Sequence, residues 1–273
     1  MITLSSDFGW PYPAAMKGVI LGRTDARLVD ITHQFPRQDV RASAFWLREV
    51  LPFFPPAVHL VVVDPGVGTD RAAVVVRAGE HALVGPDNGV VLPVARRLGG
   101  SNGGSPGGLD VFRVGERPST GQEADPGSDW PPVPASATFH GRDVFAPAAA
   151  EVHRRGVGSL DSAPGFERVE TFVDLEFPEA TVGGDTATGA VLVVDGFGNA
   201  ITNVPGRVVA DRFGTTIRVD GERAPVRETY ARVDPGQRLV TVGSHGNVEL
   251  AVNRGRGDAA FDVEAGSSVE LSW

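Results

Sequence analysis

A short, nearly apolar run that ends at an acid and a tight turn constrains this chain more than any other feature. Residues 58–63 are rich in β-branched side chains. Such a run predicts a strand buried on both faces of a parallel sheet. It ends at Asp64 and a Pro-Gly turn, and Arg71 follows. Ligands of open α/β sheets bind at the carboxyl ends of strands, so Asp64 and Arg71 are candidate functional residues.

The first part of the chain alternates between strand and helix patterns. We predict a mostly parallel sheet that is covered by helices on both faces. The expected strands are residues 2–4, 27–31, 58–63, 73–76, 81–84 and 109–114, and the expected helices are residues 14–23, 40–53, 90–98 and 144–154.

The pattern changes after about residue 170. Short apolar runs separated by turn signals predict a smaller all-β domain, barrel-like, at 170–273. The α/β domain is expected at 1–165, and its Gly-, Pro- and Ser-rich stretch 99–137 predicts a flexible surface loop that is interrupted by the strand expected at 109–114. The apolar runs lie at residues 190–194, 208–210, 215–219, 238–242, 248–252 and 268–273.

Charge and cysteine content exclude several classes of function. The formal net charge of -9 argues against a nucleic-acid partner. With 0 cysteines there is no disulfide framework, thiol nucleophile or Cys-ligated metal. The residue spacings match no metal site, GxGxxG motif or Walker A motif. The chain shows neither a signal peptide nor a membrane-spanning run, so we expect a cytoplasmic protein.

Polar groups recur where strands are expected to end, and His140 stands in a second polar cluster at 138–143. Asp64, Arg71 and His140 converging at one site would hold and polarise a water molecule. The alternative interpretation is that Asp, Asn and Gly at these places simply form turns, and that Asp64 and Arg71 form a salt bridge that braces one of them.

Eight motifs in one order resemble a known family. The motifs are Ser6-Asp7-Phe8-Gly9, Met16-Lys17-Gly18-Val19-Ile20-Leu21, Val29-Asp30-Ile31-Thr32-His33, Val62-Val63-Asp64-Pro65-Gly66-Val67-Gly68, Gly85-Pro86-Asp87-Asn88-Gly89, Phe139-His140-Gly141-Arg142-Asp143-Val144-Phe145-Ala146-Pro147, Asp195-Gly196-Phe197-Gly198-Asn199 and Glu249-Leu250-Ala251-Val252-Asn253. Together they resemble the S-adenosyl-L-methionine (SAM) hydroxide adenosyltransferases, or SAM hydrolases, which are relatives of the SAM-dependent fluorinase and chlorinase. The resemblance covers most of the chain except 99–137 and 155–185.

The resemblance implies a fold, an assembly and a reaction. It implies an N-terminal α/β domain, a C-terminal β-barrel and a homotrimer with SAM bound between subunits. The implied reaction is hydrolysis of SAM, as substrate and without a cofactor, to adenosine and L-methionine. Methionine leaves as a neutral thioether, so the attack at C5′ needs only a positioned oxygen nucleophile that loses a proton.

Site roles carry over from the family to matching residues. Asp64, Arg71 and His140 match the set that holds the water, with His140 the natural proton acceptor. Asp7 matches the aspartate that binds the ribose hydroxyls. In the second domain the matching residues are Asp195 for the methionine ammonium, Phe197 and Asn199 for adenine, Ser244 for the methionine carboxylate, and also His245 and Asn253.

One segment departs from the family pattern. Family members have an acidic residue shortly after the Asp-Phe-Gly step, whereas this chain is two residues shorter there and has Trp10. Either Trp10 supplies a cation–π contact to the substrate's cationic groups, or it is a packing residue.

Two other functions compete with hydrolysis. A halogenase carries a serine where this chain has Gly141, and Asp64 would repel a halide. A non-catalytic SAM-binding protein would bind SAM without turnover, and a complete Asp/Arg/His set argues against it.

Overall fold

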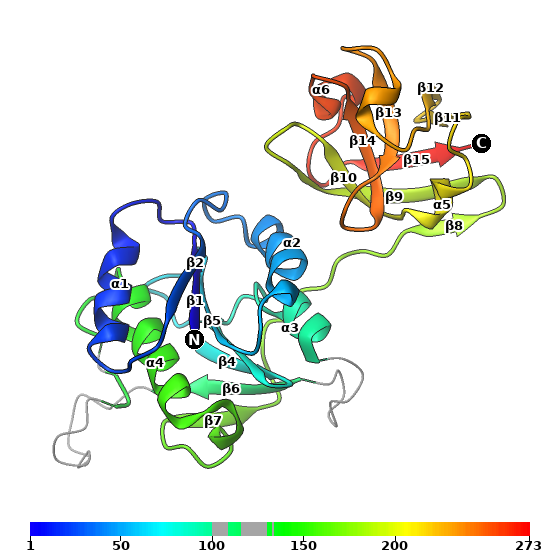
Figure 1. Ribbon diagram of the computed structural model, residues 1–273. Coiled ribbons are helices and arrows are strands. Elements are labelled where there is room, and N and C mark those ends of the chain that lie inside the picture. The colour runs from blue at the N-terminus through cyan, green and yellow to red at the C-terminus, as the bar shows by residue number, and fades with distance from the viewer. Residues whose placement is uncertain (100–108, 116–129, 133) are drawn as a thin grey trace. The chain divides into compact units, whose positions relative to one another are not determined.

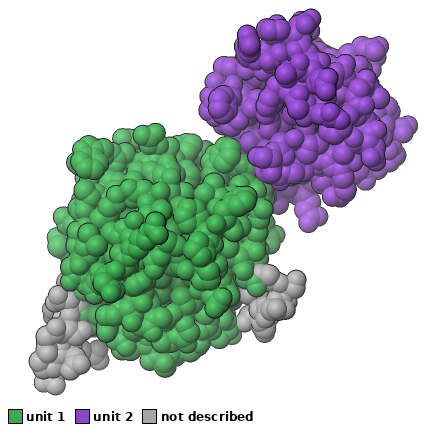
Figure 2. Space-filling model, in the orientation of Figure 1, with its two compact units in different colours: residues 1–176 green, residues 177–273 purple. Residues whose placement is uncertain are grey.

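The chain forms two separate β-sheets, one in each of two compact units (Figure 2). The computed structural model describes residues 1–99, 109–115, 130–132 and 134–273. The units are residues 1–176 and 177–273. The first unit runs past the junction expected at 165–170 because Arg96 holds the segment that follows. Its guanidinium binds the carboxylate of Asp174 and the carbonyl of Leu175.

The first sheet has a switch point beside the expected functional strand. Among the described residues its order is β2-β1-β3-β5-β4-β6-β7 (Figure 1). The pairs from β2 to β5 are parallel, and those from β5 to β7 are antiparallel. The chain passes from β1 to β2 on one side and later to β3 on the other, which is where ligands bind in such sheets. The strands are β1 (Ile2–Ser6), β2 (Leu28–Thr32), β3 (Val58–Val62), β4 (Ala73–Ala78), β5 (His81–Pro86), β6 (Asp110–Val114) and β7 (Phe166–Val169).

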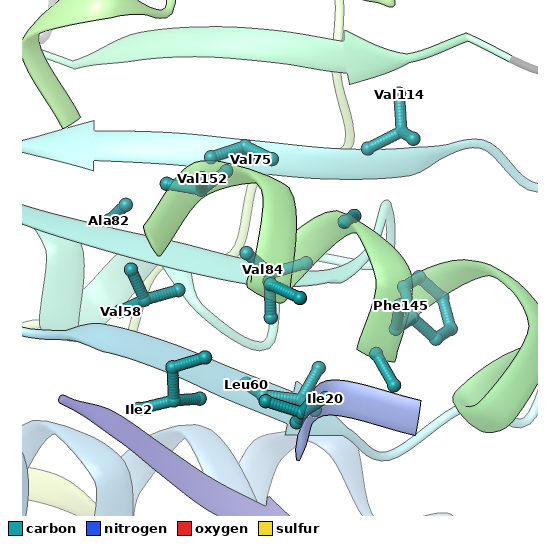
Figure 3. Packing of buried hydrophobic residues seen from close by; sticks show 14 of the residues in the cluster. Ile2, Ile20, Val58, Leu60, Val75, Ala82, Val84, Val114, Phe145 and Val152 are labelled. Carbon is teal, nitrogen blue, oxygen red and sulfur yellow. The ribbon is translucent and has the colours of Figure 1, made fainter. Parts of the chain in front are cut away.

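Helices cover both faces of this sheet, which confirms the α/β prediction, although the sheet is mixed rather than mostly parallel (Figure 1). They are α1 (Tyr12–Leu21), α2 (Val40–Val50), α3 (Leu92–Gly99) and α4 (Ala146–Arg155). On one face α1 and α4 pack together, and Val152 and Phe145 lie over Val75 and Val84 of the sheet (Figure 3). On the other face α2 packs against α3, which contacts β4 and β5. Strand residues alternate between these two cores, so both faces are apolar as expected for a buried sheet.

The second unit is a nearly closed antiparallel barrel, as the all-β pattern predicts. Its strands run in the order β12-β11-β15-β9-β10-β14-β13, with β8 beside β9, and a bridge between Val226 and Val240 joins the two ends. The elements are β8 (Thr181–Gly183), β9 (Thr186–Val194), β10 (Ala200–Pro205), α5 (Arg207–Ala210), β11 (Thr216–Val219), β12 (Glu222–Pro225), β13 (Arg238–Val242), β14 (Asn247–Val252), α6 (Gly257–Phe261) and β15 (Ser268–Ser272).

One segment differs from the sequence expectation. The apolar run 208–210 is not a strand but part of the single helical turn α5, whose Val208 and Val209 are buried in the barrel core. A run of three apolar residues is too short to show the spacing that distinguishes a helix from a strand. Such a run therefore indicates burial and not the type of element. Within the stretch 99–137 the strand expected at 109–114 is confirmed as β6, and the loop expected around it falls largely on residues 100–108, 116–129 and 133, which lie outside the described part. No helix in the described ranges is long and apolar enough to cross a bilayer.

A pair of histidines, one buried and one half-buried, links three strands of the first sheet. His59 on β3 is fully buried, and its ring nitrogens contact the Thr3 hydroxyl at 2.8 Å and His81 Nδ1 at 2.9 Å. Burial, with a smaller contribution from His81, lowers the pKa of His59 to about 3. The folded chain therefore keeps this imidazole neutral at pH values where an exposed histidine is charged.

We expect the protein to lose stability as the pH falls below about 6.5. The unfolded chain protonates His59 near pH 6.5 and the folded chain near pH 3, so the unfolded state binds more protons between these values. For this one group the free energy of unfolding falls by about 2 kcal/mol between pH 7 and pH 5. Urea unfolding of wild type and His59→Gln at both pH values measures it. An equal pH dependence in the two proteins would contradict the assignment.

Candidate functional site

Asp64, Arg71 and His140 are in direct contact. Arg71 Nε donates to Asp64 Oδ1 at 3.0 Å and Arg71 Nη2 to Asp64 Oδ2 at 2.5 Å, a two-point ion pair. Arg71 Nη2 also lies 3.2 Å from His140 Nδ1. The side chains of Asp64 and Arg71 are only 4% and 9% exposed. The structure thus brings together three residues that the sequence separates by up to 76 positions, from Asp64 to His140.

A tight double turn reverses the chain between Asp64 and Arg71. The amide of Val67 donates to Asp64 O, and the amide and hydroxyl of Thr69 both donate to Gly66 O. Gly68 has a φ of +82° and lies close to Ala137 O, so a residue with a side chain would be strained there. The turn thereby brings the side chain of Arg71 back to the carboxylate of Asp64.

The neighbouring turn at 85–89 braces this pair, a role that we did not assign from the sequence. Asn88 Nδ2 donates to Val63 O at 2.9 Å, next to Asp64. The amide of Asp87 donates to Ala72 O, which also accepts from Arg71 Nη1. Asn and Asp in a turn give no sequence signal for such a contact, because they favour turns in any case.

His140 precedes a π-helical turn, Gly141–Phe145, which overlaps the start of the helix expected at 144–154. The wide turn joins directly to α4, whose first turn contains Pro147 and therefore lacks one amide donor. Single π turns are common at functional sites. The turn packs closely, because a Cβ on Gly141 would lie 3.0 Å from Met16 Sδ and 3.1 Å from the Phe139 ring.

The contact with Arg71 decides the tautomer of His140. A guanidinium only donates hydrogen bonds, so His140 Nδ1 is the acceptor and the neutral ring carries its proton on Nε2. From the sequence we expected His140 to accept the proton of the water. In the structure the lone pair on Nδ1 of the neutral ring already accepts a hydrogen bond from Arg71, so the ring offers Nε2–H as a donor instead. Burial raises the pKa of Asp64, and Arg71 and the Gly66 amide only partly oppose the rise. A raised pKa makes Asp64 a stronger base than an exposed aspartate.

Asp7 follows β1 at the same edge of the sheet. Ser6 pairs with Val62, so Asp7 and Asp64 follow neighbouring parallel strands at the switch point. Asp7 is 9% exposed, and its Oδ2 accepts the Gln38 amide at 2.7 Å. This bond occupies one of the two carboxylate oxygens. Trp10, three residues further on, is 82% exposed and does not belong to the core.

The 195–199 turn of the barrel is organised by its own aspartate. Asp195 Oδ1 accepts the amides of Phe197 and Asn199, and Asp195 Oδ2 accepts Asn199 Nδ2 at 3.0 Å. Asn199 is buried, whereas the Phe197 ring is 80% exposed. The turn therefore combines an exposed aromatic ring with a carboxylate that hydrogen bonds hold in place.

His245 is part of a partly buried polar row that we did not identify from the sequence. Its Nε2 lies 3.4 Å from Glu249 Oε2, and Glu249 Oε1 accepts the Tyr230 hydroxyl at 2.5 Å. Burial and the charges of Glu249 and Asp195 raise the pKa of Tyr230. Glu249 begins the last of the eight family motifs, but no role was assigned to it from the sequence. Ser244 beside His245 is exposed.

The two turns of the barrel lie at opposite ends of one strand pair. Ala200 pairs with Leu250 and Pro205 with Asn247, so 195–199 lies at one end and 243–246 at the other. The row from His245 to Tyr230 runs between them. Asn253 has a structural contact, because its Nδ2 donates to Val233 O at 2.7 Å. Across the described ranges, no group of three or more His, Cys, Asp or Glu side chains is arranged to hold a metal ion.

Comparisons with known proteins identify the family of the chain. Residues 2–161 match the model of the SAM hydroxide adenosyltransferase N-terminal domain, and residues 189–270 match that of the C-terminal domain. A (R)-S-adenosyl-L-methionine hydrolase from Salinispora tropica is 37% identical, covering 99% of this chain and 97% of that protein. One from Thermus thermophilus is 40% identical, covering 97% of each.

A solved structure has the same architecture along its whole length. It is an uncharacterized conserved protein from Thermotoga maritima, which is 30% identical, covers 100% of both chains and has a TM-score of 0.78. The two family models, the sequence relatives and the solved structure all match this chain over most of its length. The chain belongs to the SAM hydroxide adenosyltransferase family.

Proposed function

We propose that this protein hydrolyses SAM to adenosine and L-methionine. The observation that carries the proposal is the contact of Asp64, Arg71 and His140 at the switch point of the sheet, beside Asp7. Membership of the family and the names of the hydrolase relatives support the same reaction.

In the proposed step a water oxygen attacks C5′ in line with the C5′–S bond. The new O–C5′ bond forms while the C5′–S bond breaks, and its electron pair stays on sulfur, so methionine leaves as a neutral thioether. The water proton passes to Asp64, whose burial makes it the stronger base. His140 Nε2–H holds the water oxygen, and Arg71 fixes both groups. Fixing the water in line with the bond supplies the entropic part of the rate enhancement.

The remaining roles are proposals of the same kind. We assign Asp7 to the ribose hydroxyls, Asp195 to the methionine ammonium, Phe197 and Asn199 to adenine, and Ser244 with His245 to the methionine carboxylate. Asn253 supports the loop beside them. The exposed ring of Phe197 suits a side chain that packs on a ligand or another subunit. We propose a cytoplasmic homotrimer that needs no cofactor or metal.

The close packing at Gly141 favours hydrolysis over halogenation. A serine at this position would press on Met16 and on the Phe8 and Phe139 rings, all within 3.2 Å of a Cβ there. Asp64 adds a negative charge that water tolerates and a halide does not.

The expected products of a SAM incubation are adenosine and methionine in equal amounts, with activity retained after chelator treatment. Chromatography of reactions with each sulfonium epimer measures both products, because the relatives are named for the R epimer. Three results would overturn the proposal: 5′-chloro- or 5′-fluoroadenosine as the main product in halide buffer, binding without turnover, or a loss of activity that a divalent metal restores.

Asp7→Asn is expected to weaken SAM binding by about 1.5–3 kcal/mol, the worth of a hydrogen bond to a charged group. The asparagine still accepts the Gln38 amide, so the loop keeps its position while the charge is lost. Calorimetric titration measures the affinity, and the unfolding midpoint controls for the fold. An unchanged affinity would remove Asp7 from the site.

A further inference from the structure

The loop that follows β2 sets the orientation of Asp7. Residues 33–38 are hydrogen-bonded to residues 6–9 at four places, one of which is the side-chain contact between Ser6 and His33. The Gln38 amide binds the Asp7 carboxylate at 2.7 Å. Two backbone bonds join the same segments, from Gly9 N to His33 O at 2.8 Å and from Phe35 N to Ser6 O at 3.3 Å.

A row of four side chains anchors the start of this loop. Ser6 Oγ lies 2.8 Å from His33 Nδ1, and His33 Nε2 lies 3.0 Å from Asp30 Oδ1. Lys17 Nζ donates to Asp30 Oδ2 at 2.5 Å. In the neutral ring, His33 Nε2–H donates to the Asp30 carboxylate. Nδ1 is then the acceptor of the hydrogen bond that the Ser6 hydroxyl donates. The row connects α1 and β2 to the residue immediately before Asp7.

The row has no chemistry of its own in the proposed reaction. Ser6 is fully buried, so its hydroxyl is not accessible as a nucleophile. The loop that the row anchors carries strain, because Gln38 has a φ of +60°, which a non-glycine residue adopts at a cost. Such a conformation persists only where surrounding contacts hold it, and His33 begins the segment that holds this one.

We propose that His33 is a positioning residue for ribose recognition, acting through Ser6 and the 33–38 loop on the carboxylate of Asp7. The inference rests on the proposed function, since it assumes that Asp7 binds the ribose hydroxyls of SAM. It assigns a role to Lys17, Asp30 and His33, for which the reaction itself provides none. His33 sets how tightly a nucleoside with both hydroxyls binds, and leaves the chemical step unchanged.

The test compares adenosine with 2′,3′-dideoxyadenosine by titration calorimetry on the full-length protein. His33→Ala is expected to weaken adenosine binding about tenfold, in the range of couplings within one hydrogen-bond network, and to leave the dideoxy analogue within about twofold. His33→Asn keeps an acceptor near the Nδ1 position for Ser6, so it is expected to restore most of the affinity. It also keeps the test readable should His33→Ala fail to fold.

His153→Ala is the matched control. His153 is also a half-buried histidine of the first unit with two contacts, to the Thr24 hydroxyl and the N-terminal amine at 2.9 Å each, and it is not connected to Asp7. This variant is expected to bind both nucleosides like wild type. With SAM as substrate, His33→Ala is expected to raise KM and leave kcat unchanged.

A double-mutant cycle tests whether His33 acts on adenosine binding through Asp7. In the Asp7→Asn background His33→Ala is expected to have no further effect on adenosine binding. A full tenfold loss in that background, or equal weakening of both nucleosides, overturns the inference. Wild type that fails to distinguish the two nucleosides overturns it as well, because Asp7 then reads no hydroxyl. Failure of the proposed function is separate, since it shows as absence of turnover while the binding ratios remain measurable.

Discussion

His140→Ala and Asp64→Asn are each expected to lower the turnover of SAM by about 10²–10⁴-fold, the usual worth of a positioned acid–base group. The two residues share one arginine, with Arg71 Nη2 touching both. Because they act on one water, the double variant is expected to lose far less than the product of the two single losses. Single-turnover rates measure the effects, and calorimetry with SAM confirms that binding persists. Strictly multiplicative losses would show that the residues act independently.

Different replacements of His140 distinguish whether its side chain acts as a hydrogen-bond donor or as a proton acceptor. A glutamine places an N–H near the position of Nε2, whereas an asparagine reaches only that of Nδ1. If His140 donates from Nε2, as its contact with Arg71 requires, His140→Gln retains part of the activity and His140→Asn resembles His140→Ala. Equal loss in all three variants would return the proton-acceptor role to His140.

Arg71→Ala is expected to destabilise the protein by about 3–5 kcal/mol, because it leaves a buried carboxylate without its partner. Asp64 is only 4% exposed, and its pKa, already raised by burial, would rise further without the guanidinium. Turnover should fall with Asp64 protonated and His140 released. Arg71→Lys is expected to rescue only in part, since a lysine cannot reproduce the two-point contact. Chemical unfolding and turnover are measured on the same samples.

The paired change Asp64→Asn with Arg71→Met separates catalysis from bracing. Replacing both partners removes the uncompensated charge, so most of the stability is expected to return while turnover stays low. A double variant that folds and still hydrolyses SAM would leave the ion pair only the role of bracing its turn.

Regular elements with a strong pattern were predictable. The apolar run 58–63 became β3, and the spacing of Val40, Ala44 and Leu47 became α2, because one buried face imposes its period on the sequence. The helical turn at 208–210 was not, because three residues are shorter than one period. The π turn before α4 likewise differs from an α-helix in its hydrogen bonds and not in its apolar pattern.

Within the candidate site, the sequence by itself determined which residues carry charge and where strands end. Asp64 follows a β-branched run and Asp7 follows a short strand, and acids at the carboxyl ends of parallel strands lie at one edge of the sheet. Only the tertiary structure decided which partners they meet. The donation from Arg71 to His140 fixes a tautomer, and the Gln38 amide fixes the carboxylate of Asp7. A hydrogen bond depends on distance and direction between segments that are far apart in the chain, and no local pattern encodes either.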